Sequence, residues 1–319
     1  MKKVIVTGAS GFIGKALVKR LLEDNIQVWA IVRDKEKLND LDDNGKLKIV
    51  VANFEQYSDI EKKINERNFD CFYYFAWDGC GYSANDYNVQ YRNIKYTCDA
   101  LSLAINLKCK KFFFPESSHE YLKDTDGVLS NIYGITKSCT KNICKVIAKQ
   151  NNIIYLGGIF ANVFGIGDYS NRSANVIIKK LINNEDLDLI EGNNLHEWTY
   201  IDDAIEAICK ITEEGKEYSS YFVGKDNMYT FREIIEIAKN VLNSKSKLNF
   251  GTYEEKSMID YSLLDKEKIY METSFKIKSN LGDSVIQTAK WIKENMLENK
   301  MGGVRLKNYA NPHNYRRSA

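Results

Sequence analysis

The sequence predicts an α/β fold in which a doubly wound parallel sheet is joined to a smaller C-terminal lobe. Three observations lead to this prediction. Over the first half of the chain, apolar runs typical of buried strands alternate with amphipathic helices. The first strand leads directly into a glycine-rich turn at 8–14. After Gly165 the alternation becomes irregular and helices dominate. Strands that are separated by helices pair in parallel, which gives a sheet covered by helices on both faces.

The first 165 residues are predicted to form the sheet domain. Each predicted strand is a short run rich in Val, Ile, Phe or Tyr, which suit a buried sheet. The helix at 15–23 carries its leucines on one face, as a helix that covers a sheet requires. The predicted strands are 4–6, 28–32, 48–52, 71–75, 111–115 and 153–160. The predicted helices are 15–23, 57–67, 91–107 and 132–149.

Residues 166–300 are predicted to form mainly the smaller lobe, while parts of 200–225 return to the first domain. The predicted helices here are 176–183, 203–212, 230–242 and 284–295, with a strand at 221–223. Thr230 and Glu233 have the spacing of a capping box at the start of a helix. Residues 301–319 contain few apolar side chains and are predicted to form a tail.

Composition and charge favour a packed globular protein. The chain has 45 basic and 43 acidic residues, so no overall charge favours nucleic acid. No apolar run approaches the ~20 residues that span a membrane. The first strand follows the first three residues directly, which leaves no room for a signal peptide, and we expect a cytoplasmic protein. Seven cysteines without a C-x-x-C pair, and only three histidines, predict no metal site.

The glycine-rich turn predicts a site for a dinucleotide. Gly8 allows a tight turn, Gly11 lets a pyrophosphate approach the backbone, and Gly14 allows the helix to pack against the strand. Phe12 and Ile13 begin the helix, whose N-terminus favours negative charge, and are assigned to the same site.

The spacing G-x-x-G-x-x-G and the phrase TGASGFIG resemble the extended branch of the short-chain dehydrogenase/reductase superfamily. That branch includes the NAD-dependent epimerases and dehydratases of nucleotide sugars, ketoreductases and dihydroflavonol reductases. The resemblance spans about residues 1–295. It implies a Rossmann-type sheet, a C-terminal lobe that binds the substrate, and a homodimer formed by the helices at 91–107 and 132–149.

The end of the second strand bears on the choice of nicotinamide cofactor. NAD-binding proteins of this fold place an acidic residue there, and the corresponding position is Val32, followed by Arg33. Arg33 resembles the arginine by which NADP-dependent extended reductases bind the 2′-phosphate, aided by Lys35 or Lys37. We therefore predict NADP(H). The alternative is NAD, with Asp34 turned inward to the ribose.

Two further turns are assigned to the cofactor by the resemblance. Asn53 and Phe54, after the third strand, occupy the place where the family has an aspartate and an apolar residue against adenine. Phe75, Ala76 and Trp77 resemble the turn after the fourth strand, whose backbone passes the cofactor. Trp77 lines the sugar site or only packs.

Tyr133 and Lys137 form a Tyr-x-x-x-Lys pair, and residues four apart lie on one face of a helix. Both side chains can therefore reach the ribose of the cofactor and the substrate, and both are assigned to cofactor binding as well as to catalysis. The charge of the lysine favours the phenolate, which can exchange a proton with a substrate oxygen. By resemblance to the family's Ser-Ser-x-x-Val-Tyr loop, Ser117 is the third catalytic residue, with Ser118 as the alternative. Dehydratases have Asp and Glu where this chain has Ser118 and His119, which disfavours water elimination. His119 assists the substrate or is an ordinary loop residue.

The remaining predicted contacts to substrate come from the second half. Asn162 lies in a segment that resembles the family's Asn-Val-Tyr-Gly motif and is assigned to the diphosphate. The arginine that holds the nucleotide phosphate in the family is His196 here, and Arg172 is a candidate to replace it.

The leading hypothesis is an NADP(H)-dependent reductase of a nucleotide-linked keto-deoxysugar that uses Ser117, Tyr133 and Lys137. The alternatives are an NAD-dependent 4-epimerase of nucleotide sugars and a reductase of a free small ketone, similar to the dihydroflavonol reductases. A nucleotide-sensing protein without activity is disfavoured, because all three catalytic residues are present. No nucleic acid or membrane partner is expected.

Overall fold

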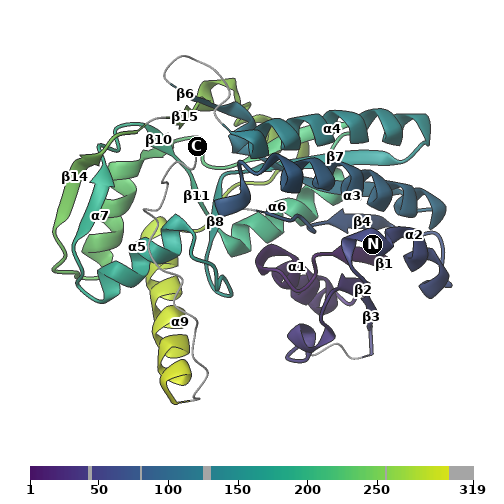
Figure 1. The fold of residues 1–319 in the computed structure, drawn as a ribbon, viewed down its shortest axis with the longest axis horizontal. Coiled ribbons are helices and arrows are strands. Elements are labelled where there is room, and N and C mark those ends of the chain that lie inside the picture. The colour runs from purple at the N-terminus through teal and green to yellow at the C-terminus, as the bar shows by residue number, and fades with distance from the viewer. Residues whose placement is uncertain (42–44, 80, 125–130, 256, 302–319) are drawn as a thin grey trace.

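A sheet of seven parallel strands forms the centre of the computed structural model, which describes residues 1–41, 45–79, 81–124, 131–255 and 257–301 (Figure 1). The strands are β1 (Lys3–Thr7), β2 (Gln27–Val32), β3 (Leu47–Val51), β4 (Cys71–Tyr74), β5 (Lys111–Ser117), β7 (Ile154–Phe160) and β12 (Ser219–Val223). Their order is β12-β7-β5-β4-β1-β2-β3. The order reverses at β1, which opens a crevice at the carboxyl ends of the strands. The predicted fold class is confirmed.

Helices cover both faces of this sheet because alternate side chains of its strands point to opposite sides. Val4 and Val6 join the apolar core that contains α1 (Phe12–Glu23) and α6 (Ile201–Glu214). Ile5 joins the core on the other face, beneath α2 (Tyr57–Ile60), α3 (Tyr87–Asn106) and α4 (Ile132–Gln150). The glycine-rich turn thus follows the carboxyl end of β1, and α4 packs on the face of the sheet that carries Ile5.

The helix predicted at 57–67 is wrong in its length. One α-helical turn, α2, lies between two 3-10 turns, η2 (Phe54–Gln56) and η3 (Glu61–Lys63). Ile64 then takes an extended backbone, which buries its side chain in the core. The Arg67 guanidinium donates to the carbonyl oxygen of Ile64 at 2.7 Å, an acceptor that a continuing helix uses for its own backbone.

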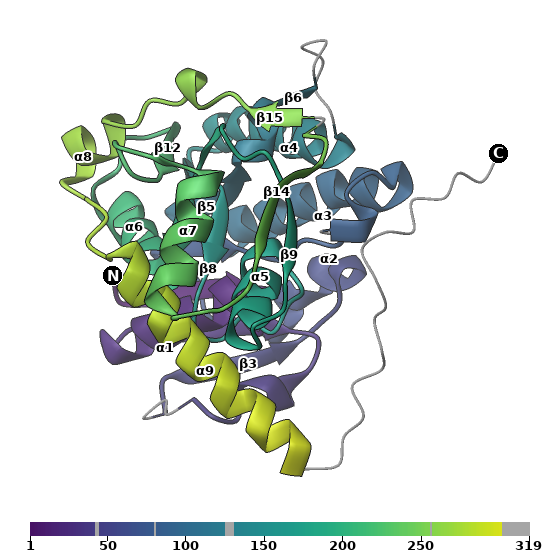
Figure 2. The same cartoon turned by 90° about the vertical axis from the view of Figure 1, so that its left-hand side faces the viewer.

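The second half of the chain builds a lobe beside the carboxyl ends of the strands. The lobe contains α5 (Ser173–Ile182), β9 (Leu187–Ile190), α7 (Phe231–Val241), β14 (Leu248–Tyr253) and α9 (Leu281–Met301). Figure 2 shows α9 running diagonally across the near side of this lobe. The predicted capping box is confirmed, since Thr230 Oγ1 accepts from the Glu233 amide and the Glu233 carboxylate accepts from the Thr230 amide at 2.7 Å.

Four strand pairs outside the main sheet were not predicted: the parallel pair of β9 with β14, and three shorter pairs. β6 (Leu122–Asp124) pairs antiparallel with β15 (Ser257–Ile259), and β8 (Asn162–Phe164) pairs parallel with β11 (Trp198–Tyr200). β10 (Leu195–His196) pairs with β13 (Tyr229–Thr230). Segments of two or three residues are too short to show an alternation of apolar and polar side chains, and their partners are distant in sequence.

The other elements are α8 (Lys268–Thr273), η1 (Lys35–Leu38), η4 (Gly81–Ser83), η5 (Ser118–Tyr121) and η6 (Tyr261–Leu263).

Within the described ranges, none of the helices combines the length and apolar character that crossing a membrane requires. The same residues contain no cluster of three or more His, Cys, Asp or Glu side chains suited to a metal ion. Met301 ends α9, and the rest of the predicted tail lies outside the described residues.

Candidate active site

The glycine-rich segment 8–14, which joins β1 to the first turn of α1, accepts only glycine at two of its positions. Gly8 has a φ of +64°, and a Cβ atom there would lie 2.7 Å from the backbone of Phe75 and Ala76. A Cβ atom on Gly14 would lie 2.2 Å from the Gly8 carbonyl oxygen. The Gly11 amide donates to that same oxygen at 2.9 Å. These contacts bring the start of α1 close to β1, and leave an open backbone surface at the helix N-terminus.

A cavity of about 210 Å³ follows this turn along the carboxyl ends of the strands. It is lined by most residues that were assigned to the cofactor, namely Gly8, Gly11, Arg33, Asn53, Phe54, Phe75, Ala76 and Trp77. Sequence reasoning missed Ser10, Ile31, Val32, Ala52 and Tyr57, which also line it. Ser10 lies between two glycines of the turn, a position that signals contact with the same ligand.

The cavity has a cationic end where β2 stops. Arg33 and Lys37 both line it, and the Arg33 guanidinium lies 5.9 Å from the centre of the Phe54 ring. Asp34 is not among the described lining residues, and its carboxylate instead accepts from the Glu36 amide at 3.0 Å to cap η1. The open backbone turn, the aromatic wall and the cationic end fit a dinucleotide.

Tyr133 and Lys137 lie on the first turns of α4, near the other end of this cavity. The buried Lys137 ammonium donates to the Pro115 carbonyl oxygen at 2.9 Å. It also lies 3.8 Å from the centre of the Trp77 ring and 5.8 Å from that of Tyr133. The Trp77 ring meets the Tyr133 ring edge-on at 5.9 Å. Trp77 therefore touches the predicted catalytic pair and lines the cavity that the glycine-rich turn borders.

Ser117 ends β5 and caps η5, so it lies where the loop turns toward α4. Its hydroxyl oxygen accepts from the His119 amide at 3.2 Å. The His119 ring packs edge-on against the Tyr133 ring at 5.7 Å. A Cβ atom on Gly134 would lie 2.0 Å from the His119 carbonyl oxygen, so the glycine lets α4 approach this loop. Ser118, the alternative catalytic serine, is fully buried.

Two histidines near the site are held in their neutral forms. Burial lowers the pKa of His119, whose Nδ1 atom lies 3.1 Å from the Asn131 amide nitrogen. Burial is the main reason that the pKa of His196 is lowered to about 4; a backbone hydrogen bond at Leu195 opposes this shift, and proximity to His119 adds to it. The structure thus brings these two predicted residues within electrostatic reach of each other. His196 does not carry the positive charge at pH 7 that an arginine would supply in its place.

Asn162 and Arg172 lie at different places in the lobe. The Asn162 side-chain amide donates to the Glu197 carbonyl oxygen at 3.3 Å, which joins β8 to β11. Arg172 precedes α5, and its guanidinium lies 6.0 Å from the centre of the Phe12 ring. Both Arg172 and Phe12 line a second cavity. The substrate roles predicted for Asn162 and Arg172 stay predictions.

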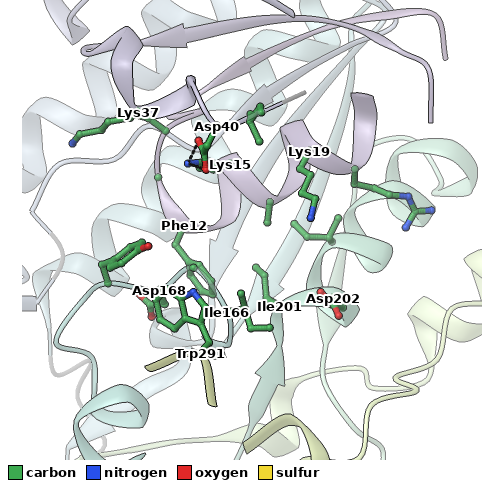
Figure 3. A pocket seen from close by; sticks show the side chains of 18 of the residues that line it. Phe12, Lys15, Lys19, Lys37, Asp40, Ile166, Asp168, Ile201, Asp202 and Trp291 are labelled. Carbon is green, nitrogen blue, oxygen red and sulfur yellow. Dashed lines mark hydrogen bonds and ion pairs between the residues drawn. The ribbon is translucent and has the colours of Figure 1, made fainter. Parts of the chain in front are cut away.

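This second cavity, of about 1610 Å³, lies along the outer face of α1. Phe12, Ile166, Ile201 and Trp291 gather in it, and Lys15 pairs with Asp40 across another part of its wall (Figure 3). Among the described residues, its lining includes none of the three predicted catalytic side chains. The candidate site is therefore the smaller cavity together with η5 and the start of α4.

Comparisons with known proteins show which family the chain belongs to. The model of the NAD dependent epimerase/dehydratase family matches residues 4–224. CDP-abequose synthase of Salmonella muenchen is 26% identical over 255 residues, which cover 78% of this chain and 84% of that protein. The dTDP-4-dehydro-6-deoxyglucose reductase of Escherichia coli is 24% identical, covering 77% of this chain and 84% of its own length.

A solved structure shows the same fold over nearly the whole chain. The UDP-N-acetylglucosamine 4-epimerase of Methanobrevibacter ruminantium M1 superposes with a TM-score of 0.80 at 22% identity, covering 92% of this chain and 99% of the other. The family match spans the glycine-rich turn, η5, α4 and the seven-stranded sheet. The chain therefore belongs to the NAD dependent epimerase/dehydratase family, within the extended short-chain dehydrogenases/reductases, which are NAD(P)-dependent enzymes.

Proposed function

We propose that this enzyme uses NADP(H) to reduce a keto group, at C4, of a nucleotide-linked deoxysugar. Two curated relatives support the substrate class, because their names describe a CDP-linked sugar and a dTDP-linked 4-keto-6-deoxysugar. Each matches more than three quarters of this chain. The name of the second is that of a reductase.

The observation that carries the cofactor assignment is the different placement of Arg33 and Asp34. Arg33 and Lys37 line the cavity where a 2′-phosphate would lie, and a guanidinium suits a phosphate because its planar fork donates twice. The Asp34 carboxylate is engaged with the backbone of η1 instead. A site that prefers NAD would need an acidic side chain placed to bind the 2′-hydroxyl of the ribose.

The reaction follows from the roles of three side chains. A nicotinamide cofactor, held by the glycine-rich turn and Arg33, would supply the hydride for the keto carbon. Tyr133 donates its phenolic proton to the keto oxygen, and the nearby Lys137 ammonium stabilises the phenolate that remains. Ser117 holds the same oxygen by a hydrogen bond from its hydroxyl group. His119, Ser118, Asn162, His196 and Arg172 are proposed to contact the substrate, with the two histidines acting as neutral groups.

Cofactor discrimination is the first test. The purified protein is heat-denatured, any released nucleotide is identified, and NADPH and NADH are then titrated by fluorescence. We expect exchangeable binding, with a Kd for NADPH at least about tenfold below that for NADH, because charged hydrogen bonds contribute about 1.5–3 kcal/mol. Arg33→Ala should abolish the preference. Lys35→Ala, which removes a neighbouring cation that does not line the cavity, should keep it.

Tightly retained NAD, with no preference for the 2′-phosphate, would contradict the NADP(H) assignment and make a 4-epimerase the working model. The same catalytic residues serve an epimerase, which oxidises and then reduces its substrate.

Activity is tested on a panel of CDP-linked and dTDP-linked 4-keto sugars. Tyr133→Phe should lower kcat by about a hundredfold to ten-thousandfold, because a positioned proton donor contributes that much. Its affinity for NADPH should change little. Tyr270→Phe alters an exposed tyrosine on α8 and serves as the matched control. Full activity of Tyr133→Phe would refute the assigned mechanism.

We also propose a homodimer that buries the outer faces of α3 and α4. Tyr91 on α3 is 71% exposed, and Val146 on α4 is 58% exposed. Ile135 and Ile143 extend the apolar surface along α4. Contiguous exposed apolar side chains indicate an interaction surface.

A cytoplasmic location and a separate substrate-binding lobe at 166–300 complete the proposal. The six cysteines that the structure describes are free thiols, which suits a reducing compartment.

A further inference from the structure

A buried network of charges lies beneath the loop that carries Ser117. Tyr133, Lys137, Lys141 and Lys145 follow one another at intervals of four residues, so they share one face of α4. Lys137 contacts the backbone of β5, as described above. Lys141 and Lys145 continue the row away from the cavity, and both reach polar groups between α4 and the sheet.

The Glu120 carboxylate links Ser117 to α4. One of its oxygens accepts from the Ser117 amide at 3.2 Å. Its other oxygen accepts from the Lys141 ammonium in a close contact. The Lys141 side chain is only 13% exposed and that of Glu120 is 1% exposed, so the ion pair is shielded from solvent. A chain of two hydrogen bonds therefore joins the backbone of Ser117 to the helix that carries Tyr133 and Lys137.

Glu116 anchors this chain to the sheet. It lies 3.6 Å from the Lys141 ammonium and accepts from the Tyr155 hydroxyl at 2.8 Å. It also accepts from the Ser220 hydroxyl at 2.6 Å, and Ser220 in turn accepts from Lys145 at 2.9 Å. A Cβ atom on Gly157 would lie 1.9 Å from the Glu116 carboxylate, so this glycine of β7 makes room for it.

A buried network of this kind is weak evidence for a contribution to stability. Burying a carboxylate or ammonium costs several kcal/mol, and apolar side chains of similar volume often stabilise a protein equally well. A buried ion pair does, however, fix the orientation of its two side chains, because the contact is lost if either group moves. The network lies directly behind Ser117, at the point where β5 ends and the chain turns toward α4.

We propose that Glu120 and Lys141 are positioning residues, which hold the Ser117 hydroxyl at the distance from Tyr133 that proton transfer requires. This inference rests on the proposed function, since it assumes that Ser117 and Tyr133 act on one substrate oxygen. An error of 1 Å in such a constellation can lower a rate by about a hundredfold.

Because Glu120 holds Ser117 through a charged carboxylate, kcat should depend on whether that carboxylate is ionised. Burial raises the pKa of Glu120, and the charge of Glu116 raises it further, while Lys141 opposes both. The other groups that face Glu120 are Lys145 on α4, Tyr155 on β7 and the adjacent Tyr121. As the pH falls through the pKa of Glu120, the carboxylate is protonated and its ion pair with Lys141 is lost. We therefore expect kcat to decrease on the acid side.

Three variants give different pH profiles. Lys141→Met removes the cation, so it should lower kcat at pH 7 by about tenfold to a hundredfold and move the acid limb to higher pH. Glu120→Gln cannot ionise, so it should have a low kcat without this limb. Lys141→Arg should restore the wild-type profile. Lys149→Met changes the next, exposed lysine of the same row and is the matched control. KM for the keto sugar should change less than kcat in each variant.

A second measurement is independent of activity. Hydrogen exchange of the peptide that contains the Ser117 amide is followed by mass spectrometry, without cofactor or substrate. Lys141→Met and Glu120→Gln keep an oxygen that can accept from the Ser117 amide, but they remove the ion pair that holds this oxygen in place. The weaker hydrogen bond should speed exchange of this amide by about three- to tenfold in both variants. The β1 peptide should exchange at the wild-type rate.

The outcomes separate the positioning role from the function. Wild-type profiles in Lys141→Met and Glu120→Gln, with Tyr133→Phe inactive, would overturn the positioning role alone. A lower urea midpoint with an unchanged acid limb would also overturn it, because the network would then be purely structural. Faster exchange at Ser117 together with full activity of Tyr133→Phe would instead refute the proposed function.

Discussion

At the scale of single residues, His196 shows what a sequence tells about a site and what it does not. The sequence places a histidine where the family has an arginine. Its charge depends on burial, with the centre of the Phe231 ring 5.1 Å from that of the imidazole ring, and on His119 in η5. These neighbours are distant in sequence, so only the fold reveals that the side chain is neutral. The role of the glycines, in contrast, can be predicted from the sequence, because Gly14 approaches Gly8, which is only six residues away.

His196 predicts a specific dependence of stability on pH. Its pKa is about 4 in the folded protein and about 6.5 when unfolded. Between pH 6.5 and pH 4, the unfolded chain binds more protons at His196 than the folded protein does. The contribution of neutral His196 to the free energy of unfolding is therefore lost as the pH falls from 6.5 to 4, by up to about 3 kcal/mol. Urea unfolding of the wild type and of His196→Asn should show that the variant loses less free energy on acidification. Titration of the His196 ring near pH 6.5, observed by NMR, would contradict this.

At the scale of elements, features set by neighbouring residues in the sequence could be predicted, and features set by tertiary contacts could not. The capping box of α7 was predicted because both partners lie within one turn. The length of α2 was not, because the extended backbone at Ile64 is set by burial in the core rather than by its neighbours. Glu116 and Glu120 were also missed, since their cation and hydroxyl partners come from α4, β7 and β12.

The Thr230 cap gives a test at this scale. Thr230→Ala removes the oxygen that accepts from the Glu233 amide, and should lower the free energy of unfolding by about 1 kcal/mol. Thr230→Ser keeps a hydroxyl group and should cost much less. Equal losses in the two variants, measured by urea denaturation, would show that the methyl group of Thr230 matters and the cap does not.

At the scale of the whole molecule, the fold was predictable because strand and helix alternate over half the chain, and parallel pairing follows from that order. The position of the lobe beside the strand ends was implied only by resemblance. The large cavity along α1 was not predicted, because it is formed by segments from opposite ends of the chain, including Phe12 and Trp291 (Figure 3).

The proposed homodimer is tested by placing a charge on its interface. Val146→Lys should dissociate the dimer, because an ammonium group would have to be buried without a partner. Ile286→Lys introduces the same charge on α9, away from α3 and α4, and should leave the dimer intact (Figure 1). Sedimentation velocity distinguishes the species. A wild-type protein that sediments as a monomer at micromolar concentration would remove the basis of the proposal.

The pairing of β6 with β15 couples distant parts of the chain. β6 begins one residue after η5 ends, and β15 belongs to the segment that leads to α8 and α9. The Asp260 amide also donates to the Tyr121 carbonyl oxygen at 3.1 Å. Any displacement of that segment must either break these hydrogen bonds or pull on the loop that starts at Ser117. The strand pair thus couples the position of the candidate catalytic serine to that of the C-terminal part of the chain.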